Sequence, residues 1–318
     1  MPVEIIFAAG HTPVDLNNLF IASEKPELMV KQAESAGFSH NICSWIKGIY
    51  SATLNHDIKQ VIAVTGGDCS NTIALAEILG RKGVKIISFE YPLSKDRGFL
   101  ESQIDRLRMS LSATREKIEE TRVNLNRIRA KLMEIDRLTF KENVVTGLEN
   151  HQFLVGSSDF GSDPDRFEKG LDAFIKKAEK RPPGKDEIRL GYLGVPPIFT
   201  GFYEFIESLG GRVVFNEVQR QFSMPCSSKD IVDQYLKYTY PYDIGGRMED
   251  IRQAVSERKL DGLIHYTQTF CFRQLYDMII RKESPVPVLT LEGDRPGKID
   301  SRIALRIETF IEMLKDRK

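Results

Sequence analysis

Cysteine is the residue type in this sequence with the clearest capacity for chemistry. The chain has 4 cysteines, at positions 43, 69, 226 and 271, and no two of them form a Cys-x-x-Cys pair. Cysteines this widely separated do not suggest the disulfide framework of a small secreted protein. A lone cysteine is most often a small buried hydrophobe, whereas several thiolates in similar settings can bind a metal centre. The local setting of each cysteine therefore decides its interpretation.

Cys69 stands at the junction between an expected strand and an expected helix. An apolar, β-branched run at residues 61–64 is followed by a glycine-containing turn at residues 65–68, and helical spacing begins near Asn71. In a parallel α/β sheet this junction lies at the carboxyl edge, where ligands bind. The sequence therefore places the Cys69 thiol at a ligand-binding edge.

Cys271 and Cys43 have the same kind of setting. Cys271 follows an expected strand at residues 262–266 and a turn at residues 267–270, and Cys43 precedes the helical stretch at residues 45–53. The N-terminal end of a helix carries a partial positive charge and free N–H groups, which favour the thiolate form. Three thiols at three helix starts predict a set of metal ligands.

The dispersed spacing of the cysteines favours an iron–sulfur cluster over zinc, because structural zinc sites usually show paired cysteines. A [4Fe–4S] cluster held by Cys43, Cys69 and Cys271 has one iron without a protein ligand, and an open metal position suits Lewis-acid chemistry on a substrate. Cys226 lies in an expected loop, and we interpret it as a spare thiol or as a ligand in a minor arrangement. The alternative for all four cysteines is that they are buried and inert.

Two histidines lie near these cysteines in the sequence. His265 precedes the turn that leads to Cys271, and His40 precedes Cys43. Each is either a polar group at the site or a hydrogen-bonded core histidine, and a buried strand favours the second interpretation for His265. The sequence has no Walker or Rossmann glycine pattern and no Gly-x-Ser-x-Gly elbow. Neither a P-loop ATPase nor a serine hydrolase is therefore expected.

Short apolar runs predict a β-α-β unit in the N-terminal region. Residues 2–8, 61–64 and 84–89 are expected strands of a buried parallel sheet, and residues 71–79 are an expected helix. Across residues 94–141, apolar residues recur every three or four positions on a highly charged background. This spacing predicts one helix of about 40 residues, about 60 Å long, or a pair of helices. We expect this segment to pack across two lobes rather than to form a coiled coil with a partner.

The alternation of strands and helices resumes after a linker, Arg181-Pro182-Pro183-Gly184. Strands are expected at residues 188–193, 212–215, 262–266 and 286–291, and helices at residues 199–209, 229–238, 248–258, 272–281 and 301–314. The pattern predicts an α/β protein with two Rossmann-like doubly wound lobes joined by a long helical segment. The expected boundaries are residues 1–93 for an N-terminal lobe with two cluster ligands, 94–184 for the helical connecting segment, and 185–318 for a C-terminal lobe with the third ligand.

Composition excludes several classes of function. The 318 residues include 45 basic and 45 acidic ones, so no excess of positive charge is available for a nucleic-acid backbone. The first residues lack the features of a signal peptide, and no run of about 18 apolar residues occurs. We therefore expect a cytoplasmic protein that binds neither nucleic acid nor membrane.

Three C-terminal segments resemble a known enzyme family. Residues 261–271, DGLIHYTQTFC, are similar to the cluster-ligand segment of the 2-hydroxyacyl-CoA dehydratase and benzoyl-CoA reductase family, and residues 287–294 and 302–314 follow at the matching distance. The resemblance covers nearly the whole chain and is to a D-component-like subunit of 2-hydroxyglutaryl-CoA dehydratase. Cys43 and Cys69 match the positions of the other two ligands, whereas Tyr240-Pro241 stands where many members have Cys-Pro.

The resemblance implies a fold, a cofactor and a reaction. The implied fold has two Rossmann-like lobes with a [4Fe–4S] cluster in the cleft between them. The implied enzyme is an oxygen-sensitive lyase of anaerobic metabolism, in which one electron converts a thioester carbonyl to a ketyl radical and water is lost. The alternative is a low-potential iron–sulfur reductase or electron-transfer subunit of the same fold that acts on a different substrate.

The resemblance also implies partners and residues that line the site. The partners are a homologous second subunit or a second copy of the chain, a separate ATP-hydrolysing iron–sulfur activator, and an acyl-CoA or other small-molecule substrate. Four polar residues that flank the matched segments are expected to line the cleft: His265, Gln268, Arg247 and Glu292.

Overall fold

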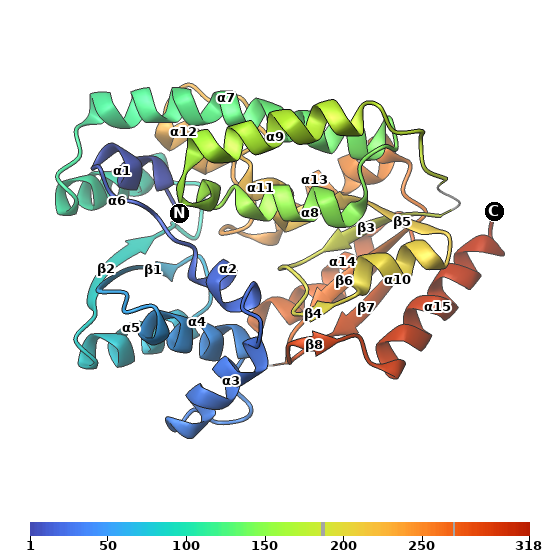
Figure 1. The fold of residues 1–318 in the computed structure, drawn as a ribbon, viewed down its shortest axis with the longest axis horizontal. Coiled ribbons are helices and arrows are strands. Elements are labelled where there is room, and N and C mark those ends of the chain that lie inside the picture. The colour runs from blue at the N-terminus through green and yellow to red at the C-terminus, as the bar shows by residue number, and fades with distance from the viewer. Residues whose placement is uncertain (186–187, 270) are drawn as a thin grey trace. The chain divides into compact units, whose positions relative to one another are not determined.

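The chain divides into two compact units, whose helices and strands are labelled in Figure 1. The computed structural model describes residues 1–185, 188–269 and 271–318. Unit 1 comprises Met1–Ile128, Ser158–Pro164 and Met224–Asp243, and unit 2 comprises Arg129–Ser157, Asp165–Ser223 and Ile244–Lys318. Each unit combines helices with parallel strands, which confirms the predicted α/β class. The pair of Rossmann-like lobes and the boundaries at residues 93 and 184 stay predictions.

Unit 1 contains a β-α-β unit of the predicted kind. Strands β1 (Gln60–Gly66) and β2 (Lys85–Glu90) pair in parallel, and helix α5 (Asn71–Arg81) connects them. Apolar side chains of α5 pack against those of α4 (Ser44–Asn55) in one buried cluster. The other helices of this unit are α1 (Val3–Ala8), α2 (Leu16–Ile21), α3 (Pro26–Ser35), α6 (Arg97–Ser110), the first part of α7 (Arg115–Phe140), η1 (Phe160–Ser162) and α12 (Ile231–Lys237).

The predicted strand at residues 2–8 is wrong, because Val3–Ala8 form the helix α1 and Pro2 is its N-cap. The α1 residue Glu4 is fully buried. Its carboxylate accepts hydrogen bonds from Gln234 Nε2 (2.6 Å) and Tyr235 Oη (2.8 Å). A short apolar run fits a buried helix as well as a buried strand, so its periodicity does not decide between them. The partners of Glu4 come from a segment far away in the sequence, so the local pattern does not reveal them.

The long charged segment forms a pair of helices rather than one. Helix α6 ends at its C-cap Leu111, and Ser112 has a positive φ of 60°. The Thr114 hydroxyl then accepts a hydrogen bond from the backbone N–H of Lys117 (3.2 Å), as a residue at a helix start commonly does. The expected apolar seam of α7 is buried, and it includes Ile118, Leu125, Ile128, Leu132 and Ile135.

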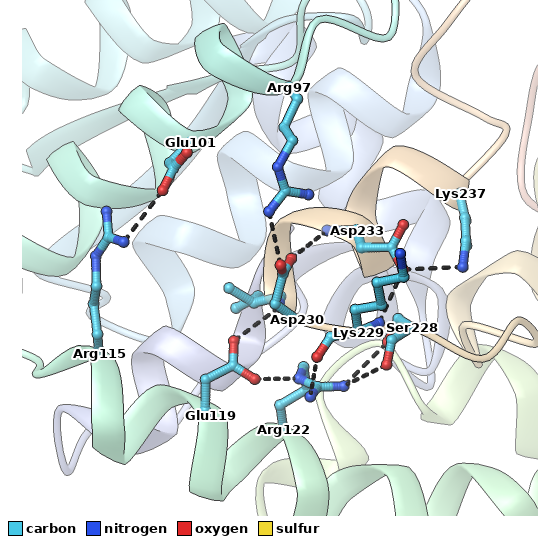
Figure 2. A network of polar contacts seen from close by, with 11 residues as sticks. Arg97, Glu101, Arg115, Glu119, Arg122, Ser228, Lys229, Asp230, Asp233 and Lys237 are labelled. Atoms are coloured by element: carbon cyan, nitrogen blue, oxygen red, sulfur yellow. Dashed lines mark hydrogen bonds and ion pairs between the residues drawn. The ribbon is translucent and has the colours of Figure 1, made fainter.

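A polar network fixes the turn before α12 to α6 and α7 within unit 1 (Figure 2). The Arg122 guanidinium donates hydrogen bonds to Ser228 Oγ (3.1 Å) and to the carbonyl of Lys229 (3.2 Å). Arg97 Nη2 donates to Asp230 Oδ2 (2.7 Å), and Asp230 also caps α12. The segment Met224–Asp243, which carries Cys226, is therefore held to unit 1 by side chains of α6 and α7.

Unit 2 is built on a sheet of four parallel strands in the order β5 (Gly211–Asn216), β3 (Ile188–Leu193), β6 (Gly262–Thr267) and β7 (Val288–Glu292). Helices α10 (Phe202–Ser208) and α15 (Ser301–Lys315) cover one face, because a Cβ on Gly211 would lie 3.0 Å from Ile206 and 3.1 Å from Ile311. Apolar residues of α13 (Ile244–Arg258) and α14 (Asp277–Glu283), among them Met248 and Ile280, form a buried cluster with the other face. In this strand order the chain changes direction between β3 and β6, and ligands bind outside the carboxyl ends of the strands at such a point.

The strands expected in this region are confirmed. Unit 2 contains the end of α7, then α8 (Gly147–Gly156), α9 (Pro164–Ala178), β3 (Ile188–Leu193), β4 (Phe199–Thr200), α10 (Phe202–Ser208), β5 (Gly211–Asn216), α11 (Glu217–Phe222), α13 (Ile244–Arg258), β6 (Gly262–Thr267), η2 (Phe272–Tyr276), α14 (Asp277–Glu283), β7 (Val288–Glu292), β8 (Gly297–Lys298) and α15 (Ser301–Lys315). The helix expected at residues 199–209 begins late, because β4 pairs with β8 and Gly201 has a φ of 81°. None of the helices formed by the described residues is long and apolar enough to cross a membrane.

Candidate functional site

Cys43 and Cys69 both lie at the carboxyl edge of the β1–β2 sheet. Helix α4 leads into β1 and helix α5 leads out of it, so the N-terminal ends of both helices lie at the carboxyl end of that strand. Cys43 is the N-cap of α4, and Cys69 precedes Ser70, the N-cap of α5. Both thiols are half-buried. The two cysteines therefore have the expected local setting, and their role as ligands stays a prediction.

Close packing defines the turn that carries Cys69. Gly67 has a φ of 81°, and a Cβ at this position would lie 2.7 Å from Tyr91 Cβ and 2.8 Å from the carbonyl oxygen of Pro241. The backbone N–H of Tyr91 also donates to the Gly66 carbonyl (3.0 Å). The turn thus has no room for a side chain at Gly67, which fixes the path of the backbone two residues before the thiol.

Replacing Gly67 with alanine is expected to destabilise unit 1 by about 2–4 kcal/mol, from left-handed backbone strain and the two close contacts together. Gly83→Ala is a matched control, because Gly83 has a similar φ of 86° with no atom within 4 Å of the added Cβ. That variant should lose only the backbone part, about 1–2 kcal/mol. Urea unfolding followed by circular dichroism measures both, and equal losses would show that the packing against Tyr91 and Pro241 contributes nothing.

Cys271 begins a 3₁₀ helix rather than an α-helix. It is the N-cap of η2, and α14 follows directly. Its backbone N–H donates to the Gln268 carbonyl (3.1 Å), and its own carbonyl accepts from the Gln274 N–H (3.0 Å). The thiol is half-buried, as in Cys43 and Cys69. Phe270, at the end of the expected turn, lies outside the described residues.

Gln268 and Glu292 lie beside the Cys271 turn. Gln268 is buried, and its Nε2 donates to the Tyr266 hydroxyl oxygen (3.0 Å). Glu292, the last residue of β7, is exposed and accepts a hydrogen bond from Gln274 Nε2 (3.2 Å). Gln268 thus contacts β6, the strand before the thiol, and Glu292 contacts η2, the helix after it.

Arg247 forms a buried ion pair that joins three elements of unit 2. Its side chain is 2% exposed, and its Nη2 donates to Glu217 Oε2 (2.8 Å) at the start of α11. The same carboxylate oxygen accepts from the backbone N–H of Gly194 (3.0 Å), just after β3. Burial of Glu217 opposes its ionisation, but the Arg247 guanidinium and the Gly194 N–H hold its pKa below the usual range. The pair therefore connects the carboxyl ends of β3 and β5 to α13.

His265 has the contacts of a core histidine. It is buried on β6, and its Nδ1 lies 2.7 Å from Asp277 Oδ1. The Thr290 hydroxyl donates to the same oxygen (2.6 Å). Burial of Asp277 opposes its ionisation, but the hydrogen bonds from His265 and Thr290 hold its pKa below the usual range. His265 therefore contacts α14, the helix that follows the Cys271 turn.

The family described as 2-hydroxyglutaryl-CoA dehydratase, D-component, matches residues 1–314. The chain belongs to this family. A comparison with curated proteins gives no match. The chain is thus related to a dehydratase component, as its C-terminal segments indicated.

In this member of the D-component family the cysteines fall into two classes. Cys43, Cys69 and Cys271 are half-buried, whereas Cys226 is exposed in the loop between α11 and α12. A cubane takes one thiolate per iron, and the surrounding protein controls its exposure to solvent and its reduction potential. Three half-buried thiols, each at or next to a helix start, would supply ligands for three of the four irons of a [4Fe–4S] cluster. Among the described residues, no group of three or more histidine, cysteine, aspartate or glutamate side chains is placed to hold a single metal ion.

Three acidic residues that support this region were missed from the sequence: Glu217, Asp277 and Asp294. Glu217 directly follows the strand β5, the same carboxyl-edge position that distinguished Cys69, so this signal was sufficient to find it. Asp294 has the same signal, because it stands shortly after the end of β7. Asp277 has none, because it begins α14 and its partners His265 and Thr290 lie on β6 and β7.

Proposed function

We propose that this chain is the cluster-carrying subunit of a 2-hydroxyacyl-CoA dehydratase-like enzyme, with Cys43, Cys69 and Cys271 as ligands of one [4Fe–4S] cluster. The observation that carries the proposal is the family match over residues 1–314 in a chain whose three half-buried thiols stand at helix starts. Cys226 is exposed and is not part of the proposed ligand set.

The chain's own residues hold and orient the group. Cys43 and Cys69 present two thiols at one sheet edge, and Cys271 presents a third at the carboxyl edge of the unit 2 sheet. The Arg247–Glu217 pair, in which both side chains are buried, keeps the carboxyl ends of β3 and β5 in place. When bound, such a cluster would supply single low-potential electrons for the reduction of a thioester carbonyl to a ketyl radical, from which hydroxide would leave.

The proposed partners follow from the family match. A separate ATP-hydrolysing iron–sulfur activator would deliver the electron, and a homologous subunit or a second copy of the chain would complete the enzyme. The substrate would be an acyl-CoA or another small carbonyl compound. In the alternative, the same cluster would serve a low-potential reductase or an electron-transfer subunit, and dehydration assays with the activator separate the two.

Protein purified without oxygen is expected to contain about four irons and about four acid-labile sulfides per chain. After reduction it should give the paramagnetic signal of a low-potential cluster. Iron and sulfide assays together with electron paramagnetic resonance (EPR) measure this. A protein that takes up no iron after anaerobic reconstitution would exclude the proposed function.

A further inference from the structure

The chain is fixed to the sheet immediately before Cys271 by one aspartate. The backbone N–H of Thr269 (2.7 Å) and its hydroxyl (2.5 Å) both donate to the carboxylate of Asp294. Asp294 follows β7, and the nearby backbone N–H of Gly293 donates to the carbonyl of Thr267, the last residue of β6 (3.1 Å). The turn that leads to the thiol is therefore connected to the ends of both strands.

A second aspartate fixes the chain after Cys271. Asp277 is the first residue of α14, and its Oδ1 contacts both His265 Nδ1 (2.7 Å) and Thr290 Oγ1 (2.6 Å). His265 and Thr290 stand opposite each other in the β6–β7 pair. One carboxylate oxygen thus contacts two neighbouring strands. Because a carboxylate only accepts hydrogen bonds, Nδ1 of His265 carries the proton in this contact.

We propose that Asp294 and Asp277 are positioning residues that fix the Cys271 thiol for cluster binding, with His265 as the partner that orients Asp277. This inference rests on the proposed function. Hydrogen bonds to an ionised carboxylate are about twice as strong as neutral ones, and residues that hold a metal ligand in place tune the metal site. Asp294 contacts Thr269 on one side of Cys271, and Asp277 stands on the other side, so the chain is held both before and after the thiol.

The test uses metal-free full-length protein and the alkylation rate of each cysteine, measured by iodoacetamide labelling and peptide mass mapping. Asp294→Ala removes the acceptor for both Thr269 hydrogen bonds, and Asp294 is exposed, so the fold should tolerate the change. Cys271 should react about tenfold faster, because the turn opens locally more often. Asp316→Ala, at an exposed aspartate after α15, is the matched control and should change nothing.

Rescue by a conservative variant distinguishes positioning from general destabilisation. Asp294→Asn keeps one side-chain oxygen as an acceptor for the Thr269 N–H, so Cys271 should react at an intermediate rate. Asp277→Asn, which likewise keeps one acceptor oxygen, provides a second perturbation on the other side of the thiol.

At equal iron content, the EPR signal or reduction potential of cluster-loaded Asp294→Ala should differ from wild type. Cys43, Cys69 and Cys226 should keep their wild-type rates in every variant.

An unchanged Cys271 rate in both Asp294→Ala and Asp277→Asn would overturn the inference. An equal rise at all four cysteines would also overturn it, because that result indicates loss of the whole fold. A wild-type protein that takes up no iron, combined with faster Cys271 labelling in Asp294→Ala, would refute the proposed function while supporting the positioning of the thiol. The two proposals therefore fail in distinguishable ways.

Discussion

Replacing Cys69 or Cys271 with serine is expected to remove most of the iron from the protein. Serine has nearly the size of cysteine, but its hydroxyl keeps its proton at neutral pH, whereas cysteine binds iron as a thiolate. The iron content should fall from about four per chain to less than about one, and the EPR signal of the reduced protein should fall with it. Iron and sulfide assays on anaerobically reconstituted variants measure the effect.

Cys226→Ser is the matched control for this experiment. Cys226 is exposed, in contrast to the three half-buried cysteines. This variant should keep its iron and its spectrum. If Cys226→Ser alone lost the iron, the assignment of the ligands would be wrong. Circular dichroism of each variant separates loss of the cluster from loss of the fold.

The β-strands were the most predictable part of the fold. In β3, β5 and β6 every residue but one is buried, so these strands appear in the sequence as short, mostly apolar runs between turns. The same signal failed at residues 2–8, where the run forms α1 around the buried Glu4. It failed because a run of this length has no detectable period, and the hydrogen bonds from Gln234 and Tyr235 that satisfy Glu4 come from a distant segment.

In the site, as in the fold, features that are local in the sequence were predictable and tertiary contacts were not. The settings of Cys69 and Cys271 were predicted because a strand, a turn and a helix start are local in sequence. The groups that fix those turns were not predicted, because they act through tertiary contacts. Pro241 packs against Gly67, and Asp294 accepts a hydrogen bond from Thr269. A lone aspartate or proline carries no pattern that identifies its partner, so residues that orient a ligand are less visible in a sequence than the ligand itself.

Replacing Glu217 with glutamine is expected to lower the free energy of unfolding by about 3–5 kcal/mol. Glu217 and Arg247 are only 1% and 2% exposed, so the variant removes the negative charge of Glu217 from beside a buried guanidinium. The control is Glu283→Gln in the exposed pair with Arg252, which should cost no more than about 1 kcal/mol. Urea unfolding followed by circular dichroism compares the two. A loss at Glu217 as small as that at Glu283 would show that the buried pair does not stabilise unit 2.

The dependence on pH provides an independent check of the same pair. Because the pKa of Glu217 is lowered in the folded protein, the unfolded chain takes up the proton first as the pH falls. The stabilisation is therefore complete above the pKa of an unfolded glutamate, about 4.3, and is lost as the pH falls through the lower folded value. Wild-type protein should lose stability more steeply below about pH 4 than Glu217→Gln, which has no carboxyl group to titrate at this position. If the unfolding free energies of the two proteins changed in parallel with pH, this assignment would be wrong. If they converged at low pH, ionised Glu217 would be the stabilising species.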